Sequence, residues 1–159
     1  LGAIARRLRD HGDLEEAIRR AIGDGGEVLD EASPALQRLR QDLRKTHDRL
    51  MARLQEIVNS PAYRSALQDG IITLREGRYV VPVKVECRGQ IKGIVHDRSA
   101  SGQTLFVEPM AVVDLQNRWR ELQREEQEEI DRVLRALSRS SSTSGFLYWL
   151  MLSTPAFSE

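Results

Sequence analysis

The middle of the chain decides the fold: residues 70–108 read GIITLREGRYVVPVKVECRGQIKGIVHDRSASGQTLFVE. Four short runs rich in β-branched residues, at 71–74, 79–85, 91–95 and 104–107, are separated by turn residues. Glu76-Gly77 and Arg88-Gly89 are X-Gly pairs of the kind that closes two-residue hairpins, because glycine takes the left-handed conformation at little cost. The pattern predicts a four-stranded antiparallel β meander.

Long amphipathic segments flank this β region. Ser33-Pro34 is an N-cap followed by proline at the first helical position, and a helix is expected from there to about residue 60. Aliphatic residues recur in it at intervals of seven, which is typical of a helix that packs on a partner. They are Leu36, Leu43, Leu50 and Ile57. A returning helix is expected after Pro109, since apolar residues alternate there in steps of three and four as far as Leu137.

These patterns predict a mainly α chain with a small antiparallel β insertion, in which two long antiparallel helices carry a four-stranded β tip. Residues 1–69 comprise an N-terminal helix, over 4–22, and the first long helix. Residues 70–108 form the β region and residues 109–137 the returning helix. Residues 138–159 are an atypical tail, a serine-rich run followed by an apolar one, which suggests a reading-frame slip, a truncated gene product or a cloning remnant.

Composition narrows the functional classes. Lysine and arginine number 24, and so do aspartate and glutamate, so net charge alone predicts no partner. The single cysteine, Cys87, excludes an internal disulfide and a cysteine-based zinc cluster. The phosphate-loop, HExxH and GxSxG signatures are absent. We therefore expect no catalysis, no metal site and no cofactor in this segment. The sequence does not open with a signal peptide, so we also expect a cytoplasmic protein without a membrane partner.

The β region carries more cations than anions. Its six basic residues are Arg75, Arg78, Lys84, Arg88, Lys92 and Arg98. Its four acidic residues are Glu76, Glu86, Asp97 and Glu108, which leaves 6 − 4 = +2. Exposed cations on a β tip can contact phosphates, with an affinity independent of base sequence. The alternative is an ordinary soluble hairpin, in which the same charges only prevent the strand edges from pairing with other chains. Arg88, Lys92 and Arg98 are the first candidates for phosphate contact, with Arg75, Arg78 and Lys84 behind them.

One loop contains the residue types of a serine hydrolase, His96, Asp97, Ser99 and Ser101. Adjacent strand residues point to opposite faces, so His96 and Asp97 do not easily align on one serine. Hydrogen bonding within the turn is the simpler interpretation. The hydrolase hypothesis requires a ring nitrogen of His96 within hydrogen-bond reach of Ser99 or Ser101.

Two strings carry a family resemblance, RYVVPVK at 78–84 and GIVHDRSASGQTLFVEP at 93–109. With LDEAS at 29–33 and VDLQNR at 113–118, they resemble the clamp region of the second, Smr-bearing type of bacterial MutS protein. The resemblance covers roughly residues 4–137. It implies that the two long helices are the arms of a lever and that the β region is a clamp inserted between them.

The resemblance also implies a function. Members of this family combine core, lever and clamp regions with a dimerising ABC-type ATPase and a C-terminal Smr nuclease domain. They are associated with suppressing homologous recombination through branched DNA and with splitting collided ribosomes. The segment is then expected to grip duplex or branched DNA, or a ribosomal surface, while ATP and Mg belong to the homodimeric parent. The alternative is a coiled-coil interaction or dimerisation module, ribosome contact included, with no DNA binding of its own.

Overall fold

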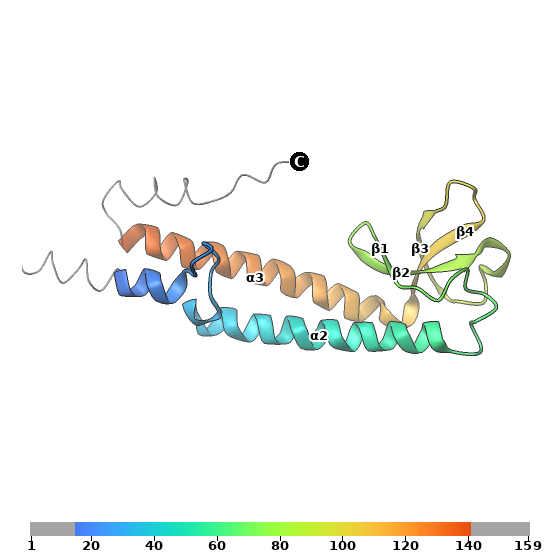
Figure 1. Ribbon diagram of the computed structural model, residues 1–159, viewed down its shortest axis with the longest axis horizontal. Coiled ribbons are helices and arrows are strands. Elements are labelled where there is room, and N and C mark those ends of the chain that lie inside the picture. Colours follow the sequence, from blue (N-terminus) through green and yellow to red (C-terminus); the bar gives the residue numbers. More distant parts are fainter. Residues whose placement is uncertain (1–14, 141–159) are drawn as a thin grey trace, which may run out of the picture. The chain divides into compact units, whose positions relative to one another are not determined.

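The computed structural model describes residues 15–140 and contains two long helices, a short one and a four-stranded antiparallel sheet (Figure 1). The long helices are α2 (Pro34–Asn59) and α3 (Val113–Ser140), and the short helix covers residues 15–21. The strands are β1 (Thr73–Arg75), β2 (Arg78–Lys84), β3 (Gly93–Arg98) and β4 (Thr104–Pro109). Three 3-10 turns are η1 (Asp30–Ala32), η2 (Val85–Cys87) and η3 (Met110–Val112).

The predicted combination of long helices with a four-stranded antiparallel insertion is confirmed. Residues 4–14 of the predicted N-terminal helix and residues 141–159 of the predicted tail lie outside the described residues. The chain divides into two compact units, and α2 and α3 contribute to both. Of the described residues, 15–41 and 123–140 form the helical unit, and 42–122 form the sheet unit.

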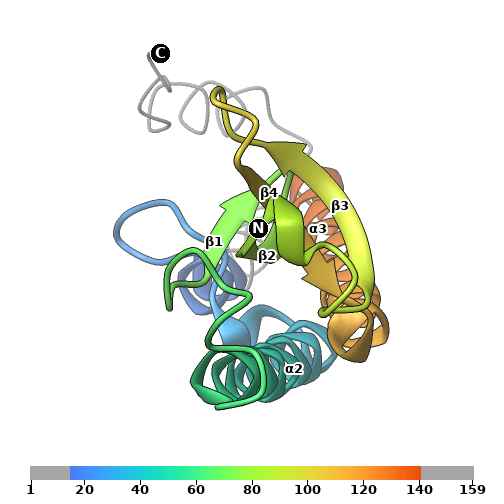
Figure 2. The same ribbon diagram turned by 90° about the vertical axis from the view of Figure 1, so that its right-hand side faces the viewer.

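The predicted meander is wrong in its strand order, which is β1-β2-β4-β3 (Figure 2). Arg88-Gly89 closes no hairpin, because β2 and β3 are not neighbours and residues 85–92 form a connection that begins with η2. β4 takes the inner position because it carries buried side chains, among them Leu105 and Val107, whereas β3 is mostly exposed and forms an edge. Glu76-Gly77 does close the β1–β2 hairpin, with positive φ at both residues as a type I′ turn requires.

Pro82 lies where β2 has a strand on one side only. It faces Phe106 of β4, while the pairing of β1 extends only to Val80. On the open side, the Gln68 amide donates to the Pro82 carbonyl at 2.9 Å. The N and C=O of one residue in an antiparallel strand point to the same side. The missing N–H of proline therefore costs the β2–β4 ladder nothing.

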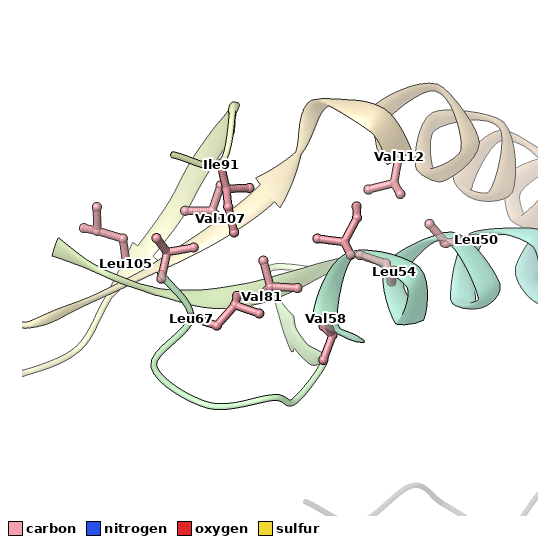
Figure 3. Close-up of a cluster of buried hydrophobic side chains, with 11 residues drawn as sticks. Leu50, Leu54, Val58, Leu67, Val81, Ile91, Leu105, Val107 and Val112 are labelled. Carbon is pink, nitrogen blue, oxygen red and sulfur yellow. The ribbon is translucent and has the colours of Figure 1, made fainter. Parts of the chain in front are cut away.

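The core of the sheet unit joins the sheet to the ends of both long helices (Figure 3). Its buried side chains come from α2, from the two strands β2 and β4, from the connections that hold residues 67 and 91, and from η3. They are Leu50, Leu54, Ile57, Val58, Leu67, Val81, Val83, Ile91, Leu105, Val107 and Val112. Val81 and Val83, two residues apart on β2, bring the same face of the strand to this core.

The helical unit has its own small core and a capped helix. Ala21, Ile22, Val28, Leu36 and Val133 are buried together. The predicted N-cap is confirmed, because the Ser33 hydroxyl accepts hydrogen bonds from the amides of residues 35 and 36, each at 3.1 Å. The same hydroxyl donates to Glu129 of α3, which Arg132 also contacts. The hydrogen bond from Arg132 has the larger effect on the pKa of Glu129, and the one from Ser33 adds to it. Together they lower this pKa from 4.5 to about 2.

Gly93→Ala should destabilise the sheet unit by about 2 kcal/mol or more. A Cβ at this position would lie 2.2 Å from the backbone oxygen of Glu108, which cannot rotate away. Gly89→Ala is the matched control, because its Cβ would meet no atom within 4 Å. Urea unfolding of both variants measures the difference, and equal free energies of unfolding would contradict the close β3–β4 approach.

Glu129→Gln should lessen the acid sensitivity of the helical unit. The folded pKa of Glu129 is depressed, so its ionised form stabilises the fold fully above about pH 4.5, and this contribution is lost as the pH falls towards about 2. The free energies of unfolding of wild type and variant should therefore differ most at neutral pH. The difference should shrink as the pH falls from about 4.5 to about 2. Glu128→Gln removes a neighbouring exposed carboxylate as the control, and a wild-type pH profile for Glu129→Gln would contradict the Ser33–Glu129–Arg132 arrangement.

Candidate nucleic-acid interface

Three of the six candidate cations are engaged within the sheet unit. Arg75 pairs with Asp97 at 3.2 Å, and its guanidinium carbon lies 4.2 Å from the centre of the Phe106 ring. The Lys84 ammonium donates to the backbone oxygen of Ser65 at 3.0 Å. Arg78 is largely buried and takes part in a polar network with α3. Their side chains have intramolecular roles.

The other three cations, Arg88, Lys92 and Arg98, are exposed. Within residues 15–140, no hydrogen bond or ion pair holds their side chains. Arg88 and Lys92 belong to the connection between β2 and β3, and Arg98 ends β3. These three residues, the free cations of the β region (residues 70–108), are the candidates that the sequence placed first.

The free cations follow the exposed edge strand. Arg88 and Lys92 line an open hollow of about 520 Å³, together with Gly89 and Gly93. Lys92 and Arg98 lie at opposite ends of β3, roughly 20 Å apart at 3.3 Å per residue. An extended polyanion that runs along β3 could contact all three.

Pairing inside the sheet preserves the charge excess. Arg75 and Arg78 are paired with Asp97 and Glu108. Of the ten charged residues counted from the sequence, four cations and two anions remain, which is 4 − 2 = +2. The potential at this edge is therefore set by groups that face solvent.

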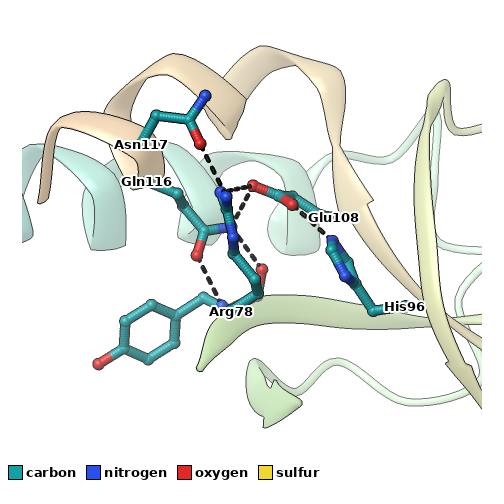
Figure 4. Close-up of polar contacts among 6 residues, drawn as sticks. Arg78, His96, Glu108, Gln116 and Asn117 are labelled. Atoms are coloured by element: carbon teal, nitrogen blue, oxygen red, sulfur yellow. Dashed lines mark hydrogen bonds and ion pairs between the residues drawn. The ribbon is translucent and has the colours of Figure 1, made fainter. Parts of the chain in front are cut away.

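A buried carboxylate, Glu108, organises the interior of the sheet unit (Figure 4). It accepts hydrogen bonds from Arg78 and from Gln116, both at 3.0 Å, and it lies 2.6 Å from Nε2 of His96. Gln116 of α3 also bonds the amide and the carbonyl of Tyr79, at 2.7 and 2.8 Å. The network thus connects β2, β3 and β4 to α3.

Sequence analysis missed this network. Gln116 lies beside the predicted apolar stripe of the returning helix and is fully buried. A glutamine at such a position was the one available signal, because a buried amide needs a polar partner. Which partner it meets depends on strand order, and the predicted strand order was wrong.

The hydrolase arrangement is not assembled. Nε2 of His96 meets Glu108, and no hydrogen bond joins His96 to Ser99 or Ser101 in the described part of the chain. Ser99 instead accepts from the amide of Thr104 at 3.0 Å, as expected for hydrogen bonding within the turn. Among residues 15–140, no three or more His, Cys, Asp or Glu side chains are placed to hold a metal ion. The helices described there are also too short or too polar to cross a membrane.

Known proteins share this sequence closely. A protein named Endonuclease MutS2 from Symbiobacterium thermophilum is 51% identical over 138 residues, 87% of this chain. Proteins of the same name from Pelotomaculum thermopropionicum and Halalkalibacterium halodurans are 52% and 49% identical over 79% and 89% of the chain. This chain is a segment of the MutS2 family. No family model matches it.

The predicted family resemblance is thereby confirmed, but the chain is much shorter than the MutS2 proteins that it matches. It spans 17%, 16% and 18% of these three relatives. The endonuclease activity in their name refers to the whole proteins. The MutS2 segment described here supplies three free cations in its β region, residues 70–108, and a buried network that ties the sheet to α3.

Glu108→Ala should destabilise the sheet unit by roughly 3–5 kcal/mol, because it leaves the largely buried Arg78 without its carboxylate. Glu121→Ala is the control, since its pair with Arg118 is half exposed and should be worth about 1 kcal/mol or less. Chemical unfolding monitored by circular dichroism compares the two. A loss at Glu108 no greater than that at Glu121 would show that the network does not hold the sheet to α3.

Proposed function

We propose that residues 42–122 bind the phosphate backbone of DNA for a MutS2-family protein and perform no chemistry on it. The observation that carries the proposal is the set of free cations, Arg88, Lys92 and Arg98, along an exposed edge strand. Family membership supports DNA as the polyanion, because the relatives are named endonucleases. Neutralising phosphates releases counterions and gives an affinity that does not depend on base sequence.

The spacing of the free cations suits a duplex. A row of about 20 Å is longer than the width of the major groove, which is about 12 Å. Phosphates of both strands are therefore within reach of one row. Phosphate contacts fix register and orientation on a duplex without reading its sequence.

In the parent protein, this contact would make the segment the clamp and lever of an assembly that grips branched or mismatched DNA and suppresses homologous recombination. α2 and α3 are shared by both units, so they are the covalent route from the sheet unit to the rest of a homodimeric, cytoplasmic parent. ATP, Mg and the nuclease chemistry belong elsewhere in that parent. The Glu108 network supports the coupling, because displacement of the sheet would act directly on α3.

A protein-interaction module is the second candidate, and one observation favours it. Ile94 and Val95 on β3 are 43% and 39% exposed, and an edge strand with exposed apolar side chains can pair with another chain. A ribosomal protein or a second copy could use this edge. The free cations would then be incidental to binding.

The double variant Arg88→Gln with Lys92→Gln should weaken binding to duplex and four-way-junction DNA of any sequence. The slope of log affinity against log salt concentration should become shallower by about 2, because two phosphate contacts are lost. Fluorescence anisotropy with labelled DNA over a salt series measures both quantities.

The matched control is Arg49→Gln with Arg124→Gln. It removes the same charge from two exposed helical arginines outside the edge strand, and it should leave the slope nearly unchanged. Equal slopes for the two double variants would show that Arg88 and Lys92 do not contact phosphates. Loss of co-purifying protein partners without any change in DNA affinity would favour the interaction module.

A further inference from the structure

A second hollow, of about 460 Å³, adjoins the one that Arg88 lines. It is bordered by the C-terminal end of α2, by the connection between β2 and β3, and by η3. Gly89, Ile91 and Lys92 border both hollows, and the Ile91 side chain points from this wall into the core (Figure 3). The volume lies within the range of about 300–1,000 Å³ that is usual for small-molecule sites.

The hollow contains an aromatic ring with an unused polar group. Tyr63 is half-buried and packs against the core of the sheet unit, yet its hydroxyl makes no hydrogen bond within the described residues. The hydroxyl of Tyr79, by comparison, bonds His47 at 2.9 Å. Within the described residues no buried side-chain polar atom lacks a partner, so the Tyr63 hydroxyl is open to solvent and accessible to a ligand. Met110, 58% exposed, adds a flexible apolar side chain to the same hollow.

The charges of the hollow are divided between its two ends. Near the end of α2, Arg53 and Glu56 pair with each other at 2.6 Å and offset one another. The last carbonyls of α2 also give that end a partial negative charge. The side-chain ammonium of Lys92 has no hydrogen bond or ion pair within the described chain. An anionic group is therefore favoured at Lys92 and a neutral, hydrogen-bonding group beside Tyr63.

We propose that this hollow binds one unpaired nucleotide of a branched or gapped DNA, with its base against Tyr63 and its phosphate at Lys92. The inference rests on the proposed function, since it places the unpaired nucleotide next to the backbone contacts of Arg88 and Lys92. Every base has a π face, so stacking on an aromatic ring tolerates any sequence. The Tyr63 hydroxyl and the exposed Gln90 amide offer hydrogen bonds to the base edge.

Such a site would select DNA structure without selecting sequence. A paired base must be unstacked before it can enter, which costs a few kcal/mol, whereas an unpaired base at a branch point or gap enters at a much lower cost. The backbone contacts are the same for both kinds of DNA. The preference for branched over linear DNA would then arise in the hollow, and the overall affinity along β3.

The test compares two DNA probes on the full 159-residue chain at one salt concentration. The first is a linear duplex, and the second is the same duplex with a single unpaired nucleotide. The chain should bind the second probe more tightly by roughly 5- to 150-fold, the range expected for stacking of one base. Tyr63→Leu should abolish this ratio while leaving duplex affinity unchanged, and Tyr63→Phe, which keeps the ring, should retain most of it.

Met110→Asp is a second variant that leaves the core untouched, because the side chain is exposed. It should reduce the ratio by placing a carboxylate in the hollow. A ratio that persists in both Tyr63→Leu and Met110→Asp would overturn the inference. Wild-type binding to the duplex with no preference for the unpaired nucleotide would also overturn it, and would leave the proposed function standing. Failure of the chain to bind either probe would end both.

Discussion

Glu108 is a carboxylate with no access to solvent, and its burial constrains the whole sheet unit. A buried charge is tolerated only when opposite charges or hydrogen-bond donors surround it. Here the partners come from β2, β3 and α3. The strands must therefore adopt an order that brings Arg78 and His96 to the same carboxylate, and α3 must present Gln116 to it.

This requirement is consistent with the other close contacts nearby. Gly93 begins β3 directly against the backbone of Glu108, where a side chain would not fit. The register between β3 and β4 shifts between Val95 and Asp97, which places His96 at the irregularity. Bulges of this kind redirect a side chain, and the one redirected here reaches the buried carboxylate.

The division of the cations follows from the same arrangement. Arg75 and Arg78 lie on β1 and β2, where they face carboxylates of β3 and β4 across the sheet. Arg88, Lys92 and Arg98 lie on the connection and the edge strand, where the chain offers their side chains no partner within the described residues. The paired cations stabilise the sheet, and the free cations on the connection and on β3 are available to a ligand. The hollow beside Lys92 adds an aromatic group to that ligand-facing edge.

The sequence by itself determined the elements and the family. The leucine spacing of α2, the Ser33 cap and the Glu76-Gly77 hairpin all depend on patterns within a few residues or along one helix. The strings at 78–84 and 93–109 were long enough to identify the MutS2 family. Net charge in the β region drew attention to the cations, but it could not separate the paired from the free ones.

Only the tertiary structure decided the strand order, the partners of each cation and the two hollows. Those features depend on whether β3 or β4 pairs with β2. Local propensity is almost the same for both strands, since each is a short β-branched run closed by turn residues. The choice is made by burial over the whole unit. β4 supplies the apolar side chains and the carboxylate that the interior can accommodate, so it lies inside, and the more polar β3 is left at the edge with its cations in solvent.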